Sequence, residues 1–367
     1  MSAAHAYVDL DDAEALLEAD TQGLLRAAAT AGAQVRATAA AVEEAALDPV
    51  AGGGRPRTLI WVAGRGAAES AGAMLCATFG GAAGEPLVPV AEAPPWVGPL
   101  DVVVVAGDDP GDPALVGAAA IAVRRGARVV VAAPYEGPLR DATAGRAAVL
   151  DPRLWVPDDF RLCRYLAVGL AVLAAVDPAP PARGIASADL AALADELDAE
   201  ALRNSAGREV FTNPAKSLAE RISGRRAVLA GDRAATLALA RHGAAVMLRV
   251  AGEPVAAVGL ADAVVGLREG GLGRRAGGGD EFDALFHDEE IDGPRPGRAR
   301  VVALALADER AALTARVGAV DGVDLLGVED VGDAGSVPAA GARTEHQLAI
   351  LALRLEMAAV YLRLAGG

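Results

Sequence analysis

The sequence predicts an α/β protein made of two doubly wound parallel-sheet domains in tandem, with helices on both faces of each sheet. Three observations lead to this prediction. Of the 367 residues, 53% are apolar and 23% are charged, which is enough apolar mass for a large core and excludes a disordered chain. Each half alternates short apolar runs with helical stretches, as parallel strands joined by crossover helices do. A proline-rich stretch separates the two halves.

That stretch, Asp-Pro-Ala-Pro-Pro-Ala-Arg-Gly at 177–184, marks the boundary between the domains. Proline cannot continue a helix, and a run of prolines favours an extended, stiff connection. Domains usually hold roughly 100–200 residues, so the length also predicts two of them. We therefore expect a first domain at 1–178, a linker at 179–186 and a second domain at 187–367.

The first half opens with a helical stretch at 11–47, where apolar residues recur at helical spacing. Residues 58–64 form a continuous apolar run that ends in Gly-Arg-Gly, typical of a buried parallel strand entering a helix. A second apolar run at 100–106 is followed by a polar turn and a helix at 113–125. Residues 127–132 then predict the next strand.

The second half repeats this order. A helical stretch at 187–202 precedes a strand at 226–231, which ends in Gly-Asp. A further strand at 299–306 leads into a helix at 309–317 and a short strand at 323–328. Two copies of strand, turn, helix and strand predict two sheets with right-handed crossovers.

Charge and hydropathy exclude several classes of function. The 34 basic and 49 acidic residues leave a net charge of −15 and no basic cluster, so we expect no nucleic-acid binding. The longest uncharged apolar run, 166–176, is shorter than the roughly 20 residues that span a bilayer, and it predicts a buried helix instead of a membrane segment.

The N-terminal residues predict a cytoplasmic protein, and the cysteines exclude two kinds of site. No basic residue precedes Arg26, whereas a signal peptide begins with positive charge. Cys76 and Cys163 are isolated within apolar stretches, so they provide neither a disulfide framework nor the paired spacing of a zinc site. We expect both to be small core residues.

Several strings resemble known proteins. Asn-Pro-Ala-Lys-Ser-Leu-Ala at 213–219 and Leu-Phe-His-Asp-Glu-Glu-Ile-Asp-Gly at 285–293 look like strings of the bifunctional phosphoglucose/phosphomannose isomerases, a family with the sugar isomerase (SIS) fold. The resemblance extends over nearly the whole chain, but only these short strings are specific. It implies two SIS domains, a sugar-derivative ligand, a homodimer, and chemistry that uses no metal and no cofactor.

In that family an aldose phosphate and a ketose phosphate interconvert through an enediolate. The resemblance implies that Glu253 is the carboxylate base, that His287 opens the sugar ring, and that Arg161 stabilises the enediolate. Such chemistry needs an acid/base pair and a cation near the developing oxyanion. Each residue also has a structural interpretation. Glu253 could be an exposed carboxylate in a turn, His287 could lie in an interface, and Arg161 could pair with Asp158 or Asp159.

Parallel strands hold their ligands at their carboxyl ends, where helix N-termini present free N–H groups. The resemblance therefore implies that two loops contact the ligand, at Gly64, Gly66, Ala68 and Ser70, and at Gly107, Asp108, Asp109 and Asp112. Both loops depart from the family. Ala68 stands at a serine position, and in the second loop aspartates replace the hydroxyl residues that face a phosphate. Like charges repel more strongly as water is excluded, so this loop disfavours a phosphate dianion.

A second departure concerns lysine. The family uses a late lysine in its active site, whereas the only lysine of this chain is Lys216, in a different motif. Arg354 or Arg363 could supply positive charge but cannot replace a proton-transferring amine. Two functions therefore stay open: a sugar-phosphate isomerase with rearranged phosphate contacts, and a non-catalytic member that binds a sugar derivative or a partner protein in a regulatory or scaffolding role.

A third class, a dinucleotide-dependent oxidoreductase, has only the turn at 64–66 in its favour. The acidic residue that such a site needs would fall near Glu85, within a Gly/Pro-rich stretch instead of at a strand end. We set this class aside.

Overall fold

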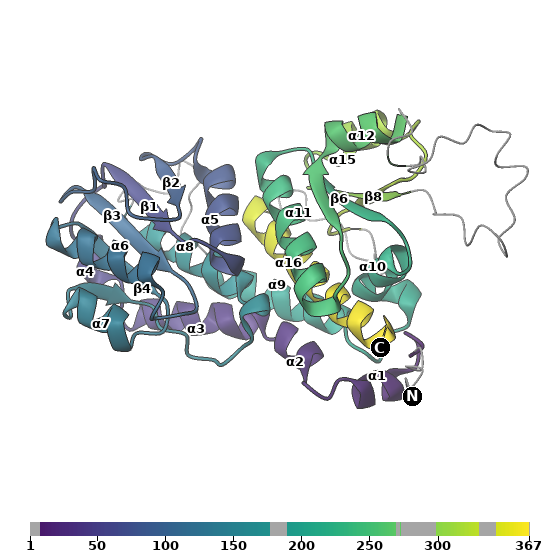
Figure 1. The fold of residues 1–367 in the computed structure, drawn as a ribbon, viewed down its shortest axis with the longest axis horizontal. Coiled ribbons are helices and arrows are strands. Elements are labelled where there is room, and N and C mark those ends of the chain that lie inside the picture. The colour runs from purple at the N-terminus through teal and green to yellow at the C-terminus, as the bar shows by residue number, and fades with distance from the viewer. Residues whose placement is uncertain (1–7, 177–188, 269–271, 273–298, 330–342, 367) are drawn as a thin grey trace, which may run out of the picture.

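A computed structural model describes residues 8–176, 189–268, 272, 299–329 and 343–366. Two α/β domains lie side by side, and a layer of helices separates their sheets (Figure 1). The first domain contains a five-stranded parallel sheet with strand order β2-β1-β3-β4-β5. The second contains a four-stranded parallel sheet with order β7-β6-β8-β9. The prediction of two doubly wound parallel-sheet domains is confirmed.

The strands of the first domain are β1 (Thr58–Val62), β2 (Leu87–Val90), β3 (Asp101–Ala106), β4 (Arg128–Ala132) and β5 (Ala147–Val149). The helices of this half are α1 (Ala13–Ala19), α2 (Leu24–Ala28), α3 (Ala31–Glu43), α4 (Asp48–Ala51), α5 (Gly66–Phe79), α6 (Pro113–Arg124), α7 (Gly137–Thr143), the 3₁₀ turn η1 (Asp158–Phe160) and α8 (Leu162–Val176).

The strands of the second domain are β6 (Ala227–Gly231), β7 (Ala256–Gly259), β8 (Arg300–Leu304) and β9 (Val323–Leu326). Its helices are α9 (Leu190–Arg203), the 3₁₀ turn η3 (Val210–Thr212), α10 (Pro214–Ile222), α11 (Ala234–Val246), the π-helical turn η4 (Met247–Ala251), α12 (Leu260–Arg268), α15 (Arg310–Val317) and α16 (Thr344–Gly366).

Alternate residues of each strand face opposite layers of helices, as a pleated sheet requires. In the first sheet, Ile60 and Val103 belong to the core under α6 and α7. Their neighbours Trp61 and Val104 belong to a larger core, which continues into the inner face of the second sheet at Leu229. Apolar runs without a polar alternation therefore mark strands that are covered on both faces.

The larger core joins the two domains. Helices α5 and α8 of the first domain pack against α11 and α16 of the second, and α16 runs through the middle of the molecule (Figure 1). Nearly every residue of α16 is buried. None of the described helices combines the length and hydrophobicity that crossing a membrane would need.

The sequence did not predict three of the strands. These are β2, β5 and β7, which are short and lie at sheet edges. One side of an edge strand is unpaired, so its residues are only partly buried and give a weak apolar pattern, as in the Leu-Val-Pro-Val of β2. The stretch 11–47 is also not one helix. Asp20 accepts hydrogen bonds from the N–H groups of Leu24 and Leu25, and Gly23 adopts a left-handed conformation (φ 66°), so the chain turns there.

The only lysine is a structural residue. Lys216 is fully buried on α10, and its ammonium group donates to the carbonyls of Ala206 and Arg208, each at 2.7 Å. Asn213 caps the same helix through its side chain, which accepts from the Lys216 N–H. The 213–219 string therefore secures the loop between α9 and α10. Of the two cysteines, Cys163 is buried as predicted, and Cys76 is only partly buried.

Candidate ligand-binding site

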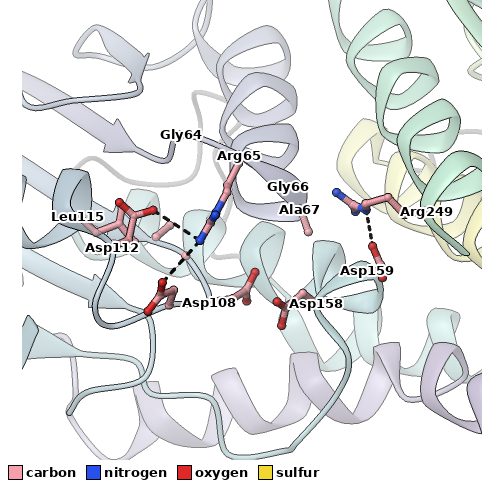
Figure 2. A pocket seen from close by; sticks show the side chains of 13 residues that line it. Gly64, Arg65, Gly66, Ala67, Asp108, Asp112, Leu115, Asp158, Asp159 and Arg249 are labelled. Atoms are coloured by element: carbon pink, nitrogen blue, oxygen red, sulfur yellow. Dashed lines mark ion pairs between the residues drawn. The ribbon is translucent and has the colours of Figure 1, made fainter. Parts of the chain in front are cut away.

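A pocket of about 410 Å³ opens at the carboxyl ends of β1 and β3 (Figure 2). The sheet order reverses between these two strands, because β1 pairs with β2 on one side and with β3 on the other. Ligands of doubly wound domains bind at this switch point. The pocket is lined by Gly64, Arg65, Gly66, Ala67, Ala106, Gly107, Asp108, Asp109, Asp112, Leu115, Asp158, Asp159 and Arg249.

The turn after β1 forms one wall. Arg65 is the N-cap of α5 in an extended conformation, and Gly66 has φ 69°, which a residue with a side chain rarely adopts. Of the residues expected in this loop, Gly64 and Gly66 line the pocket. Ala68 and Ser70 are not among the lining residues. Ala68 is buried on α5, where its carbonyl accepts the indole N–H of Trp61 at 2.9 Å.

The carboxylate of Asp108, in the loop after β3, is fixed by hydrogen bonds from residues that lie behind the pocket. Its Oδ1 accepts hydrogen bonds from Nη1 of Arg161 at 2.7 Å and from the hydroxyl of Tyr165 at 2.6 Å. The Arg161 Nε donates to the carbonyl of Val156 at 2.7 Å. Burial, together with the charge of Asp108, raises the pKa of Tyr165, so this hydroxyl stays protonated and donates. Arg161 is therefore committed to Asp108 behind the pocket and does not line it.

Asp109 and Asp112 belong to the same loop, and both line the pocket. The Asp109 Oδ1 accepts the Gly111 N–H at 2.8 Å, and the Asp112 Oδ1 accepts the Ala114 N–H at 2.9 Å as the N-cap of α6. Arg65 reaches toward Asp112 (Figure 2), with 3.8 Å between its Nη2 and Asp112 Oδ2. The same Nη2 lies 3.7 Å from Asp109 Oδ2. The N–H of Gly111 in the loop and the N–H of Ala114 in the first turn of α6 thus donate to the protein's own carboxylates.

The opposite wall comes from η1 and from the second domain. Arg249 on η4 forms an ion pair with Asp159 on η1, with 2.5 Å between Nε and Oδ1 (Figure 2). Asp158 lies beside Arg161, with 3.3 Å between Oδ1 and Nη1. Partial desolvation, followed by the charge of Asp108, raises the pKa of Asp158. The pocket is therefore assembled from both domains.

The three residues expected to be catalytic do not meet in this pocket. Glu253 follows Gly252 at the end of η4, where its N–H donates to the carbonyl of Met247, and it is not a lining residue. Arg161 is bound to Asp108. His287 lies outside the described residues. The buried His242 contacts Glu356 away from the pocket, with 3.0 Å between Nε2 and Oε1.

Sequence reasoning did not assign Asp158, Asp159 or Arg249 to the site. The sequence suggests the two aspartates only as partners for Arg161, because the edge strand β5 that precedes their loop was itself not predicted. Nothing in the sequence indicates Arg249, because its position depends on a π-helical turn and on the packing of one domain against the other. Among the described residues, no three histidine, cysteine or carboxylate side chains converge as metal ligands would.

No family model matches the chain, and no curated protein matches it in sequence. Solved structures do match it. Tagatose-6-phosphate ketose/aldose isomerase from Escherichia coli is 14% identical with a TM-score of 0.60, over 99% of this chain and 96% of that one. Glucosamine-6-phosphate deaminase from Thermotoga maritima is 10% identical with a TM-score of 0.59, over 94% and 95%.

A third structure is the C-terminal domain of glucosamine-fructose-6-phosphate aminotransferase from Francisella tularensis, which is 10% identical with a TM-score of 0.55, over 100% of this chain and 98% of that one. This chain has the two-domain SIS fold. Such low identities establish the SIS fold alone, so the narrower resemblance to the bifunctional phosphoglucose/phosphomannose isomerases stays a prediction.

Proposed function

We propose that this SIS-fold protein binds a carbohydrate derivative in the pocket between β1 and β3 and does not isomerise it. The observation that supports binding is the pocket itself. It lies at the switch point of a doubly wound sheet, and its volume of about 410 Å³ falls within the roughly 300–1,000 Å³ of small-molecule sites. Its carboxylates and guanidinium groups are suited to the hydroxyl groups of a sugar.

The absence of isomerisation is proposed from the side chains around the pocket. Enediolate chemistry needs a base within hydrogen-bond reach of the carbon proton and a cation that faces the developing oxyanion. Arg161, the expected cation, is turned away from the pocket by Asp108 and Val156. Glu253, the expected base, is not among the residues that line the pocket.

A second candidate function is the interconversion of aldose and ketose phosphates, in the manner of the bifunctional phosphoglucose/phosphomannose isomerases. Two features favour it. Arg65 and Arg249 flank the pocket, so a guanidinium group other than Arg161 could stabilise an oxyanion. Asp158 has a raised pKa on the pocket wall, as a general base often does.

Binding can be tested with a variant that fills the pocket. Gly64 has open space where a Cβ would stand, its nearest neighbour being the Ala91 carbonyl at 4.0 Å, so we expect Gly64→Phe to fold and to obstruct the pocket. Titration calorimetry and ligand-observed NMR with hexoses, amino sugars and hexose phosphates should detect a ligand for the unmodified protein. The affinity should fall at least tenfold in Gly64→Phe.

Gly52→Phe is the matched control. Gly52 is exposed at the end of α4 and has ordinary backbone angles (φ −74°), and a Cβ at this position would have no neighbouring atom within 4 Å. We expect this variant to bind like the unmodified protein. The proposal is wrong if no carbohydrate binds the unmodified protein, or if Gly64→Phe binds a carbohydrate as tightly as Gly52→Phe does.

A further inference from the structure

In the loop between β3 and α6, aspartate carboxylates of the protein itself bind the N–H groups that could bind a ligand anion. In a doubly wound domain, the N–H groups at this helix start are free to bind a phosphate. Here Pro113 has no N–H, Ala114 donates to the carboxylate of Asp112, and Gly111 donates to that of Asp109. The carboxylate oxygens of Asp109 and Asp112 also lie within 4 Å of the Arg65 guanidinium. These carboxylates thus take the N–H and guanidinium partners that a phosphoryl group would use.

The second domain repeats this arrangement at its own switch point, between β6 and β8. Arg233 is the N-cap of α11, as Arg65 is of α5. It pairs with Asp308 at 2.8 Å and with Glu309 at 2.5 Å, both in the loop after β8. The Glu309 carboxylate accepts the Leu306 N–H of the same loop. In both domains, although the loop sequences differ, an N-cap arginine and two carboxylates thus occupy the strand-end position where a phosphate could bind.

The net charge of the pocket also disfavours a phosphate. Five carboxylates line it, and the nearby guanidinium groups are those of Arg65 and Arg249, with Arg161 behind Asp108. Five negative groups against three positive ones leave an excess of two negative charges. A phosphate dianion would add to this excess, whereas an ammonium group would reduce it.

We infer that the ligand of this pocket is an unphosphorylated carbohydrate, with amino sugars preferred, because Asp109 and Asp112 occupy the place of a phosphoryl group. This inference rests on the proposed function and specifies its ligand. The hydroxyl groups of such a sugar are donors for the carboxylates, and its ammonium group supplies the missing positive charge.

The test uses the full chain, with Asp109 and Asp112 both replaced by serine. Serine is also a good N-cap, so α6 keeps its start, and circular dichroism with thermal unfolding verifies the fold. The control is Asp141→Ser with Asp262→Ser, which removes equal charge at two exposed sites outside the pocket. Inorganic phosphate, glucose 6-phosphate, glucose and glucosamine are titrated at constant ionic strength.

We expect no saturable binding of inorganic phosphate or glucose 6-phosphate to the unmodified protein or to the control. The double serine variant should gain at least tenfold in affinity for both phosphates and should lose affinity for glucosamine. The inference is overturned if the unmodified protein binds phosphate as well as the double variant does, or if the double variant gains no phosphate binding.

These outcomes are distinct from those that test the proposed function. If glucose 6-phosphate binds the unmodified protein and Gly64→Phe abolishes this binding, carbohydrate binding stands and the unphosphorylated ligand is wrong. If no carbohydrate binds, both the proposed function and the ligand class inferred from it are wrong.

Discussion

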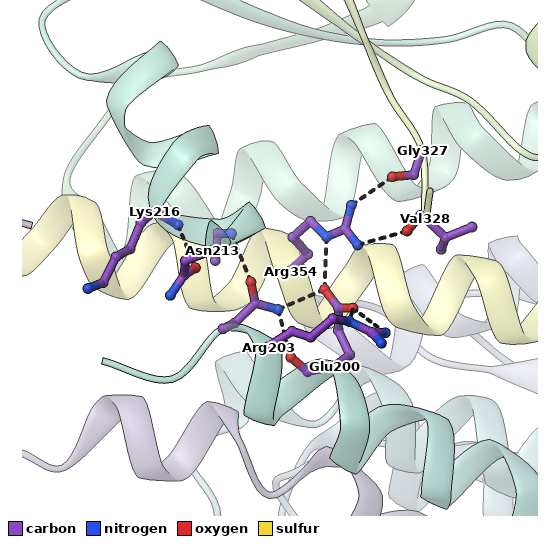
Figure 3. Close-up of polar contacts among 9 residues, drawn as sticks. Glu200, Arg203, Asn213, Lys216, Gly327, Val328 and Arg354 are labelled. Atoms are coloured by element: carbon purple, nitrogen blue, oxygen red, sulfur yellow. Dashed lines mark hydrogen bonds and ion pairs between the residues drawn. The ribbon is translucent and has the colours of Figure 1, made fainter. Parts of the chain in front are cut away.

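Replacing Arg354 by methionine is expected to lower the free energy of unfolding by about 3–5 kcal/mol. Arg354 lies on α16 at 1% exposure, and its Nε donates to Glu200 Oε1 at 2.8 Å (Figure 3). Its other nitrogens donate to the carbonyls of Gly327 and Val328. Methionine would remove the buried cation beside the fully buried carboxylate of Glu200, which would keep the partly exposed Arg203 and the amide of Asn204 as partners. Chemical denaturation followed by circular dichroism measures the change.

Two further variants separate this effect from the loss of a surface charge. Arg36→Met removes an exposed arginine that pairs with Asp195 and Asp198, and it should cost less than about 1 kcal/mol. Combining Arg354→Met with Glu200→Gln should recover part of the loss, because no carboxylate is then left buried with only the partly exposed Arg203 as its cation. A loss at Arg354→Met no larger than that at Arg36→Met would contradict this account. Arg354 is thus structural and not the source of charge for an active site.

The second large effect is expected at Asp108. Asp108→Asn should lower the free energy of unfolding by about 2–3 kcal/mol, because hydrogen bonds to charged groups contribute this much and Asp108 accepts two of them. Arg161 is 8% exposed, and with asparagine it would face a neutral partner instead of a carboxylate. Thermal or chemical unfolding of the variant measures the loss.

The neighbouring Asp109 provides the control. It is exposed, and among the described residues its carboxylate contacts the N–H of Gly111 and, more loosely, Arg65, so Asp109→Asn should change stability by about 0.5 kcal/mol or less. Equal losses at the two positions would mean that the contacts of Asp108 with Arg161 and Tyr165 do not fix the loop. A larger loss at Asp108 supports a role as a positioning residue behind the pocket.

Much of the fold could be predicted from the sequence, because strands that are covered on both faces consist of continuous apolar runs. The runs at 58–64, 100–106 and 127–132 correspond to β1, β3 and β4, which lie together in the middle of their sheet. The edge strands β2 and β5 of this sheet are shorter and only partly buried, so they have no such run. The break in the N-terminal helical stretch depends on the side chain of Asp20, whose bonds to Leu24 and Leu25 are visible only in three dimensions.

The pocket was predictable only in part, for a similar reason. Strand ends of one parallel sheet meet at one edge, so the 64–66 and 107–112 loops could be placed together from sequence order alone. The direction in which an arginine side chain points could not be predicted from sequence order. Arg161 turns to Asp108 behind the pocket, and Arg249 enters from the second domain through the packing of η4 against α16.

The pocket is proposed to hold a carbohydrate derivative without isomerising it. The most direct test incubates the purified protein with fructose 6-phosphate, glucose 6-phosphate and mannose 6-phosphate and follows their interconversion by NMR. We predict no interconversion above the rate without protein. Turnover of any of the three that Gly64→Phe or His287→Ala abolishes, and Gly52→Phe leaves intact, would contradict the proposal and establish the protein as an isomerase.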